Sequence, residues 1–214
     1  MARQDITMSP SPKFWDRVAD RYAKKPVADE ASYQHKLKVT RQYLRPSMRV
    51  LEFGCGTGST AITHAPYVKH ILATDISSRM IEIARDKARK ANVANVTFEQ
   101  ATIEGLDVAE RSMDAVLGLS ILHLLEDKDA AIAKVHRMLK ADGVFVTSTP
   151  CIGDFMPWFN LIGPLGRLFG VMPYVNVFKR EDLEASLNAA GFDIDHAWQP
   201  DRKAAVFIVA RKKR

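Results

Sequence analysis

The 214-residue chain contains little cysteine and no long uninterrupted apolar run. Its two cysteines, Cys55 and Cys151, have neither metal-ligand spacing nor the pattern of a disulfide framework, so we expect free thiols and no bound metal. A membrane-spanning helix needs about 20 consecutive apolar residues. Prolines and glycines interrupt the most apolar stretch, Cys151 to Phe178. The N-terminus also lacks a basic start followed by an apolar run. These absences favour a cytoplasmic globular protein.

Aromatic residues make up 8% of the chain, while the net charge is +6 with a pI near 9.3. The aromatic residues do not alternate with the basic ones as a base-stacking surface requires, and no known nucleic-acid-binding motif occurs. Nucleic acid is therefore disfavoured as a partner. The scattered lysines and arginines indicate a solvated surface, with contact to an anionic membrane as the alternative. The sequence does not specify an oligomeric state.

The length predicts one α/β domain rather than two, with a single sizeable core. Strand and helix patterns alternate along most of the chain, as in proteins with a parallel sheet. We divide the domain into a disordered tail (1–12), a helical lid (13–45), a cofactor-binding core (49–150), a substrate-cover insertion (151–178) and a closing helix with strands (179–210).

The central stretch runs from Arg49 to Thr60 and predicts a strand, a glycine loop and a helix. Its first five residues are typical of a buried strand, and Gly54, Gly56 and Gly58 then form a turn that few side chains could occupy. Such a loop lets backbone N–H groups approach a nucleotide closely. The spacing excludes a dinucleotide motif, whose third glycine would replace Ser59, and a P-loop, which needs Gly-Lys-Ser/Thr.

Residues 52–58, E-F-G-C-G-T-G, resemble the first motif of class I S-adenosylmethionine-dependent methyltransferases, E/D-x-G-x-G-x-G. The strings V-H-R-M-L-K-A-D-G-V-F-V-T-S and K-R-E-D-L-E-A-S-L-N-A-A-G-F-D-I also resemble this family, and the likeness extends from about Lys13 to Ala210. It implies a Rossmann-like, doubly wound and mostly parallel seven-stranded sheet with an antiparallel last strand, an N-terminal helical lid and an apolar insertion before the last helix. It further implies S-adenosyl-L-methionine as cofactor and S-adenosyl-L-homocysteine as product.

Asp75 follows the second predicted strand, His70 to Thr74. A carboxylate at this point can accept hydrogen bonds from both ribose hydroxyls, as happens in dinucleotide folds, and the resemblance implies the same role here. Alternatively, Asp75 only starts the following turn. Ser77 is a candidate N-cap for the next helix.

The adenine contacts depart from the family pattern, because members usually place an acid near Ala101. Adenine is then held either by backbone groups of Thr102 and Ile103 with apolar stacking, or by Glu104 or Gln100. The predicted cofactor-binding residues are Glu52, Gly54, Cys55, Gly56, Gly58, Asp75, Ile76, Met80, Thr102, Ile103, Leu119 and Ser120.

Two side chains are candidates for catalysis. His123 follows the buried run Met113 to Leu119, and a neutral imidazole there could accept a proton from the acceptor; alternatively it is a hydrogen-bonded structural residue. Tyr22, on the predicted lid, either donates its hydroxyl to the cofactor carboxylate or substrate, or anchors its helix to the core. Methyl transfer depends mainly on positioning in a dry cavity, so neither role is obligatory.

The apolar insertion, 151–178, is expected to determine the acceptor, with Phe155, Trp158 and Phe159 as predicted substrate-binding residues. Its apolar side chains either join the core, roof a pocket for an apolar acceptor, or contact a membrane surface. The leading hypothesis is methyl transfer to a small, partly apolar acceptor. The alternatives are a lipid-headgroup methyltransferase acting at a membrane surface and a cofactor-binding protein without catalysis.

Overall fold

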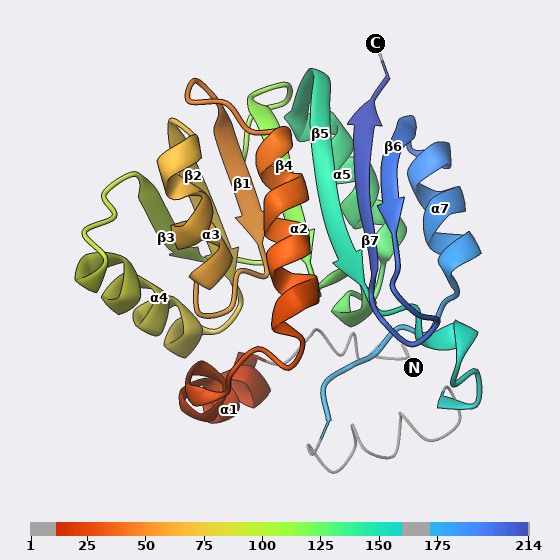
Figure 1. Ribbon diagram of the computed structural model, residues 1–214, viewed down its shortest axis with the longest axis horizontal. Helices are drawn as coiled ribbons and strands as arrows, with labels where there is room; N and C mark the ends of the chain where they lie inside the picture. The colour runs from red at the N-terminus through yellow and green to blue at the C-terminus, as the bar shows by residue number, and fades with distance from the viewer. Residues whose placement is uncertain (1–11, 160–171, 214) are drawn as a thin grey trace, which may run out of the picture.

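The computed structural model describes residues 12–159 and 172–213, whose helices cover both faces of one sheet (Figure 1). The sheet has seven strands in the order β3-β2-β1-β4-β5-β7-β6. β7 runs antiparallel to both of its neighbours, and the other paired strands run parallel. The predicted mixed sheet is therefore confirmed. The strands are β1 (Arg49–Phe53), β2 (His70–Asp75), β3 (Val96–Gln100), β4 (Met113–Leu119), β5 (Leu139–Thr149), β6 (Phe192–Trp198) and β7 (Val206–Lys212).

Three helices cover one face of the sheet and two cover the other among the described residues. The first group is α2 (Glu30–Gln42), α3 (Ser59–His64) and α4 (Ser78–Lys90), which lie in front of the sheet in Figure 1. Behind it lie α5 (Lys128–Met138) and α7 (Arg180–Ala189). α1 (Pro12–Lys24) lies beyond the carboxyl ends of the parallel strands. None of these described helices has the length and apolar character needed to cross a membrane.

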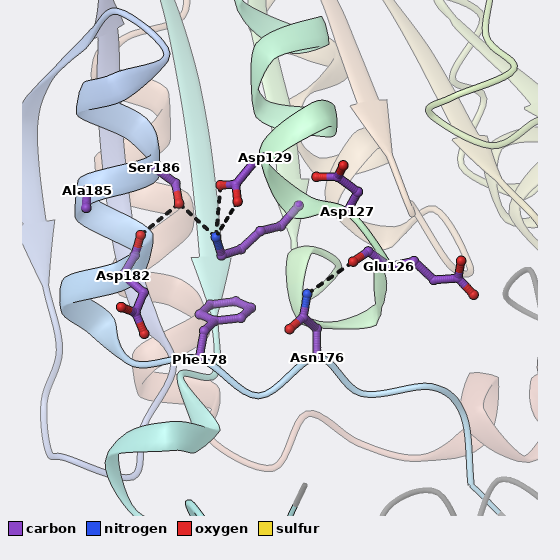
Figure 2. Close-up of a pocket in the computed structure, with 9 residues that line it drawn as sticks. Glu126, Asp127, Asp129, Asn176, Phe178, Asp182, Ala185 and Ser186 are labelled. Carbon is purple, nitrogen blue, oxygen red and sulfur yellow. Dashed lines mark hydrogen bonds and ion pairs between the residues drawn. The ribbon is translucent and has the colours of Figure 1, made fainter.

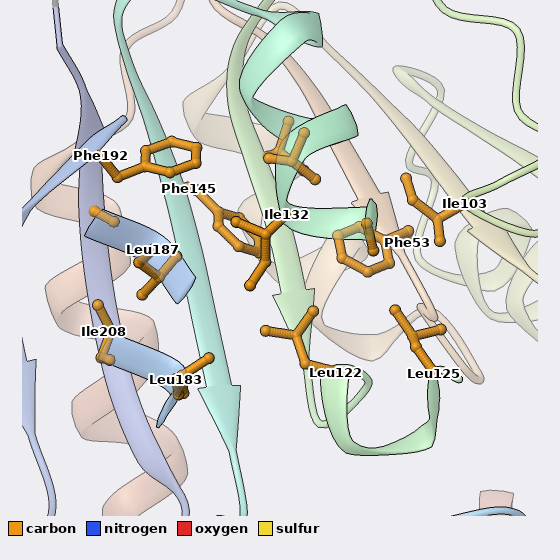
Figure 3. Close-up of a cluster of buried hydrophobic side chains, with 14 of the residues drawn as sticks. Phe53, Ile103, Leu122, Leu125, Ile132, Phe145, Leu183, Leu187, Phe192 and Ile208 are labelled. Carbon is orange, nitrogen blue, oxygen red and sulfur yellow. The ribbon is translucent and has the colours of Figure 1, made fainter. Parts of the chain in front are cut away.

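The core consists of two apolar clusters separated by the sheet. Because successive strand residues point to opposite faces, β1 places Val50 in the cluster under α2, α3 and α4, and places Leu51 and Phe53 in the cluster under α5 and α7. Figure 3 shows the second cluster, where Phe53 and Phe145 extend from the strands toward Ile132 of α5. Full burial of such side chains contributes about 1.5–3 kcal/mol each, so these layers hold the strand ends in place.

Element boundaries differ from the sequence expectation at three points. α1 begins at Pro12, one residue inside the expected tail, and proline is favoured in a first helical turn. The sequence pattern predicts a short helix from Ser59 to Val68 that stops near Pro66, whereas α3 ends at His64 and a 3-10 turn containing Pro66 follows. The pattern also predicts a turn at Asp142-Gly143 before a strand from Val144 to Thr149, whereas β5 begins at Leu139 and includes that turn. Its turn residue, Asp142, has a φ of 61°, which aspartate tolerates better than most residues.

A polar cavity of about 400 Å³ lies between α5 and α7 (Figure 2). Lys128 is among its lining residues and links the two helices. Its Nζ donates to both Asp129 carboxylate oxygens, at 2.9 and 3.1 Å, and to Ser186 Oγ at 2.7 Å. The same ammonium lies 5.3 Å from the centre of the Phe178 ring. Phe178 ends the predicted insertion just before α7, so this network lies where the insertion leads into that helix.

Candidate active site

A cavity of about 550 Å³ opens at the carboxyl ends of the central strands. The strand order changes direction between the parallel neighbours β1 and β4, because β2 and β3 lie on one side of β1 and β5 lies on the far side of β4. Ligands of open α/β sheets bind at such switch points. Most of the predicted cofactor-binding residues line this cavity, namely Gly54, Gly56, Asp75, Ile76, Met80, Thr102, Ile103, Leu119 and Ser120. Three others, Glu52, Cys55 and Gly58, are not part of its lining.

Gly56 and Gly58 serve different purposes in the loop after β1. Both have left-handed backbones, with φ of 52° and 74°. A Cβ on Gly56 would meet only the Tyr22 ring, at 3.9 Å, so this part of the loop is open to a ligand. A Cβ on Gly58 would lie 2.7 Å from Phe98 and 2.8 Å from Ala84. Gly58 therefore permits close packing of α3 against α4, while Gly56 leaves room in the cavity.

Asp75 lies in the cavity wall and ties the glycine loop to the start of α4. Its Oδ2 accepts the Gly56 N–H at 2.9 Å, and its Oδ1 accepts the Ser77 N–H at 2.9 Å. Burial raises the pKa of this carboxyl, while the two backbone hydrogen bonds lower it and so offset part of the rise. Ser77 is the N-cap of α4, as predicted, because its Oγ accepts the Met80 N–H at 3.1 Å. Asp75 thus begins the turn while still facing the cavity.

Glu52 is a buried acid behind the loop, with 3% of its surface exposed. Burial, and then the charge of Asp75, raise the pKa of its carboxyl to about 8. Its Oε2 has no hydrogen-bond partner in the described part of the protein. A buried carboxyl in this state gains from a nearby cation or donor. The chemistry fits a cofactor that carries positive charge.

His123 lines the cavity from the segment after β4. Burial lowers the pKa of its imidazole to about 4, so the ring is neutral at physiological pH. Nδ1 is buried without a partner among the described residues. The backbone carbonyl of His123 accepts the Asn176 N–H at 2.7 Å, which fixes the segment. The segment is therefore fixed by its backbone, and the neutral ring has an unpaired Nδ1 within the described part of the protein.

The N-terminal helix covers the cavity with two aromatic side chains, Trp15 and Tyr22. Tyr22 is half-exposed, and burial together with the charge of Asp75 raises the pKa of its phenol. Asp16, on the same helix, accepts hydrogen bonds from Ser77 Oγ at 2.6 Å and from the Arg79 N–H at 3.2 Å. α1 is thus anchored to the first turn of α4, beside the cofactor residues.

The far end of the cavity is apolar. Of the predicted substrate-binding residues, Phe159 lines it, while Phe155 and Trp158 do not, and Trp158 is 53% exposed. Residues 160–171 of the predicted insertion lie outside the described part of the chain. Several further wall residues were not among the predicted site residues: some lie just after β4 or β5, and the others lie in the predicted insertion. These are Ile121, Leu124, Leu125, Pro150, Ile152, Met172, Pro173 and Val175.

Cys55 and Cys151 are free thiols, as expected, and burial raises the pKa of both. Within residues 12–159 and 172–213, no three His, Cys, Asp or Glu side chains gather in a way that could hold a metal ion.

The fold is Rossmann-like, and the cavity lies at the point of the sheet where such folds bind their ligands. A family model described as a methyltransferase domain matches residues 44–189. The chain therefore belongs to the class I S-adenosylmethionine-dependent methyltransferase family.

Curated relatives share part of their length with this chain. An uncharacterized methyltransferase, YcgJ of Bacillus subtilis, is 36% identical over 122 residues, covering 54% of this chain and 48% of that protein. The ubiquinone/menaquinone biosynthesis C-methyltransferase UbiE of Haemophilus ducreyi is 29% identical over 149 residues, covering 66% of this chain and 56% of the relative. The match thus spans about half the length of these relatives.

Solved structures share the fold at low identity. The crystal structure of YcgJ has a TM-score of 0.70 and 22% identity, covering 85% of this chain and 99% of the other. Geranyl diphosphate C-methyltransferase from Streptomyces coelicolor A3(2) has a TM-score of 0.67 and 13% identity, covering 84% of this chain and 76% of the other.

Proposed function

We propose that this protein transfers a methyl group from S-adenosylmethionine to a small, partly apolar acceptor. The observation that carries the proposal is one continuous cavity. It joins the predicted cofactor residues around Gly56 and Asp75 to an apolar wall that includes Ile152 and Phe159. Its volume of about 550 Å³ falls within the range of small-molecule sites.

The cofactor would supply a methyl group activated by its positively charged sulfur. Asp75 would accept hydrogen bonds from the ribose hydroxyls, because its two backbone hydrogen bonds leave other lone pairs of the carboxylate free. Glu52, buried behind the loop with an unpaired oxygen, would favour the positive end of the cofactor. Thr102 and Ile103 would contact adenine from the end of β3. The positions of these residues in the cavity wall and behind it support the roles that the family resemblance implies.

The acceptor would bind at the apolar end of the cavity, next to His123. Burial lowers the pKa of the imidazole to about 4, so the ring is neutral but a weak base, and it would take a proton only from an acceptor whose own acidity rises as the methyl group arrives. An acceptor that is already nucleophilic needs only the positioning and the dry cavity. Relatives named as quinone-biosynthesis and geranyl diphosphate C-methyltransferases support an apolar acceptor.

The direct test incubates the protein with methyl-labelled S-adenosylmethionine and a panel of small acceptors graded in polarity, including phenols, quinols, thiols and amines. We expect transfer that increases with the apolar character of the acceptor, and a fall in rate for Phe159→Ala with apolar acceptors only. Cofactor binding with no transfer to any acceptor would instead favour a cofactor-binding protein without catalysis.

A membrane-surface reaction is the second candidate, since the exposed Trp158 lies in the predicted cover segment of a basic protein. Flotation with anionic and neutral liposomes at low and high salt tests it. Salt-sensitive binding to anionic vesicles that is weakened in Trp158→Ala would support a lipid-headgroup acceptor. If the protein binds neither kind of liposome, the small, partly apolar acceptor remains the proposal.

A further inference from the structure

Lys87 connects α4 to the glycine loop that follows β1. Its Nζ donates to Thr57 Oγ1 at 2.7 Å and to Ser59 Oγ at 3.1 Å. Thr57 is a buried residue between Gly56 and Gly58, and Ser59 is the first residue of α3. The ammonium of Lys87 therefore bridges the two residues on either side of Gly58.

α4 also contacts Gly58 through Ala84, which precedes Lys87 by three residues and so lies on the same side of the helix. A Cβ on Gly58 would lie 2.8 Å from the Cβ of Ala84. The second half of the glycine loop is thus packed against α4 at Gly58 and hydrogen-bonded to α4 at the residues before and after it.

The first half of the glycine loop is held from the other side, by β2. The Cys55 N–H donates to the Thr74 carbonyl at 2.9 Å, and the Gly56 N–H donates to Asp75 Oδ2 at 2.9 Å. Gly56 and Asp75 both line the cavity. The loop that forms this part of the cavity wall is therefore fixed between β2 and α4.

The charge of Lys87 does not explain its place beside α3. Burial lowers the pKa of its ammonium, and no ion pair joins it to a carboxylate among the described residues. A cation beside the first residue of a helix is also opposed by the helix dipole. The contacts that favour this position are the two hydrogen bonds to hydroxyl groups, and hydrogen bonds from an ammonium are stronger than neutral ones.

The left-handed glycines at positions 54, 56 and 58 leave the loop free to adopt other conformations wherever nothing holds it. We propose that Lys87 is a positioning residue, which holds the glycine loop in its cofactor-binding shape through Thr57 and Ser59. Lys87 is not among the described residues that line the cavity, so it acts without touching the ligand. The apparent affinity of a ligand falls with the fraction of protein in the binding shape. The identity of that ligand rests on the proposed function.

Calorimetry with S-adenosylhomocysteine tests the role of the lysine. Lys87→Met should bind the ligand about 5- to 10-fold more weakly than the wild type, and Lys87→Arg should restore part of the loss. The matched control is Lys90→Met, which changes an exposed lysine of the same helix and should bind as the wild type does.

Thr57→Val tests the same contact from the side of the loop, because valine keeps the volume of threonine but accepts no hydrogen bond. We expect Thr57→Val to weaken binding in the wild type and to add little in the double variant with Lys87→Met, since both changes remove one interaction. Fully additive losses would contradict coupling between these two side chains. This cycle does not depend on the folding of a single variant.

Two further readouts separate positioning from general support of the fold. With a reactive acceptor, Lys87→Met should raise the KM for S-adenosylmethionine and leave kcat unchanged at saturation, because the ligand then draws the loop into its binding shape. In the ligand-free protein, the Gly58 N–H donates to the Cys55 carbonyl at 3.0 Å. Its hydrogen exchange should accelerate several-fold in Lys87→Met, while exchange in β4 stays unchanged.

An affinity for S-adenosylhomocysteine in Lys87→Met equal to that of the wild type would overturn the positioning role, even if the Tm falls. Failure of the proposed function has a different signature, because the wild type itself would then not bind S-adenosylhomocysteine. In that case the exchange of the Gly58 amide still decides whether Lys87 holds the loop, and an unchanged rate in Lys87→Met would reject it.

Discussion

Gly56 and Gly58 share a left-handed backbone but have different surroundings, so their substitution by alanine separates stability from binding. Either alanine costs about 1–2 kcal/mol for the backbone conformation. Gly58→Ala also forces a methyl group to within 2.7 Å of Phe98, and overpacking of this kind costs about 1–3 kcal/mol more. We expect Gly58→Ala to be clearly less stable in urea unfolding. Gly56→Ala should retain more stability yet lose most of its affinity for S-adenosylhomocysteine by calorimetry.

Equal affinity for S-adenosylhomocysteine in the wild type and Gly56→Ala would contradict the inference that the ligand occupies the open space beside Gly56. Equal stability of the two variants would contradict the packing role of Gly58.

We expect His64 to lower the free energy of unfolding as the pH becomes acidic. The side chain is fully buried, both ring nitrogens lack partners in the described structure, and burial followed by the charge of Arg41 lowers its pKa to about 4. A histidine whose pKa is lowered in the fold contributes stability that is present above its unfolded pKa of about 6.5 and is lost as the pH falls toward 4. The shift corresponds to about 3 kcal/mol at the acid limit. His64→Leu should therefore flatten the fall in Tm between pH 6.5 and pH 4.

The measurement for His64→Leu is a series of thermal melts in one buffer system at constant ionic strength. His123, whose pKa is also lowered to about 4, provides the comparison: His123→Leu should flatten the same region. If the Tm of His64→Leu falls between pH 6.5 and pH 4 as steeply as that of the wild type, the buried ring does not cause the loss of stability in acid.

The sequence was sufficient to predict site residues that directly follow a predicted strand, because their place depends on neighbouring residues in the chain. Gly54 and Gly56 follow β1 directly and Asp75 ends β2, so local spacing predicted that they meet, and all three line one cavity. The sequence did not single out Lys87 or His64, because their character depends on contacts with elements far away in the chain. The Thr57 hydroxyl that Lys87 contacts is 30 residues distant.

At the scale of elements, α1 is attached to the rest of the protein by few polar contacts. Asp16 accepts from Ser77 Oγ and from the Arg79 N–H, and Asp20 forms a largely exposed ion pair with Arg79 at 2.7 Å. Exposed pairs contribute about 0–1 kcal/mol, so Asp16 is the stronger attachment. Because Trp15 of α1 lines the cavity, loosening the helix should open that wall.

We expect Asp16→Ala to accelerate amide hydrogen exchange across α1 by several-fold, with little change in β1 or β4. The affinity for S-adenosylhomocysteine should fall by about 5- to 10-fold, corresponding to roughly 1 kcal/mol or slightly more. Asp20→Ala is the matched control on the same helix and should change both quantities less. Unchanged exchange in α1 of Asp16→Ala would show that apolar packing alone holds the lid.

Element boundaries followed from local chemistry wherever the chain carried a strong signal. β1 was predicted at its observed ends, and Ser77 was correctly identified as an N-cap. The docking of α1 was not predictable in detail, because the Asp16–Ser77 contact joins positions 61 residues apart. The start of β5 was missed because the sheet tolerates a left-handed residue, Asp142, that reads as a turn in the sequence.

For the whole molecule, the sheet order creates the site. The reversal of direction between β1 and β4 leaves a crevice at their carboxyl ends, and the residues that close it come from α1 and from the segments after β4 and β5. The alternation of strands and helices predicted an α/β domain with a parallel sheet, and the resemblance to the methyltransferase family implied the seven-stranded mixed sheet that the structure has. The acceptor was not predictable to the same degree, because fold does not specify substrate and the walls come from loops rather than from a repeating pattern.

The central claim is that the cavity binds the adenosyl cofactor through Asp75, and the most direct test is a set of thermal melts. The wild type, Asp75→Ala and the exposed-acid control Asp107→Ala are each heated alone and with S-adenosylmethionine, S-adenosylhomocysteine or NAD. A ligand at 100 times its Kd adds about 2.7 kcal/mol, which raises the Tm of a domain of this size by roughly 5 to 10 °C. The account predicts that rise with both adenosyl ligands in the wild type and Asp107→Ala, a much smaller one in Asp75→Ala, and none with NAD. No rise with either adenosyl ligand at saturating concentration in the wild type would contradict it.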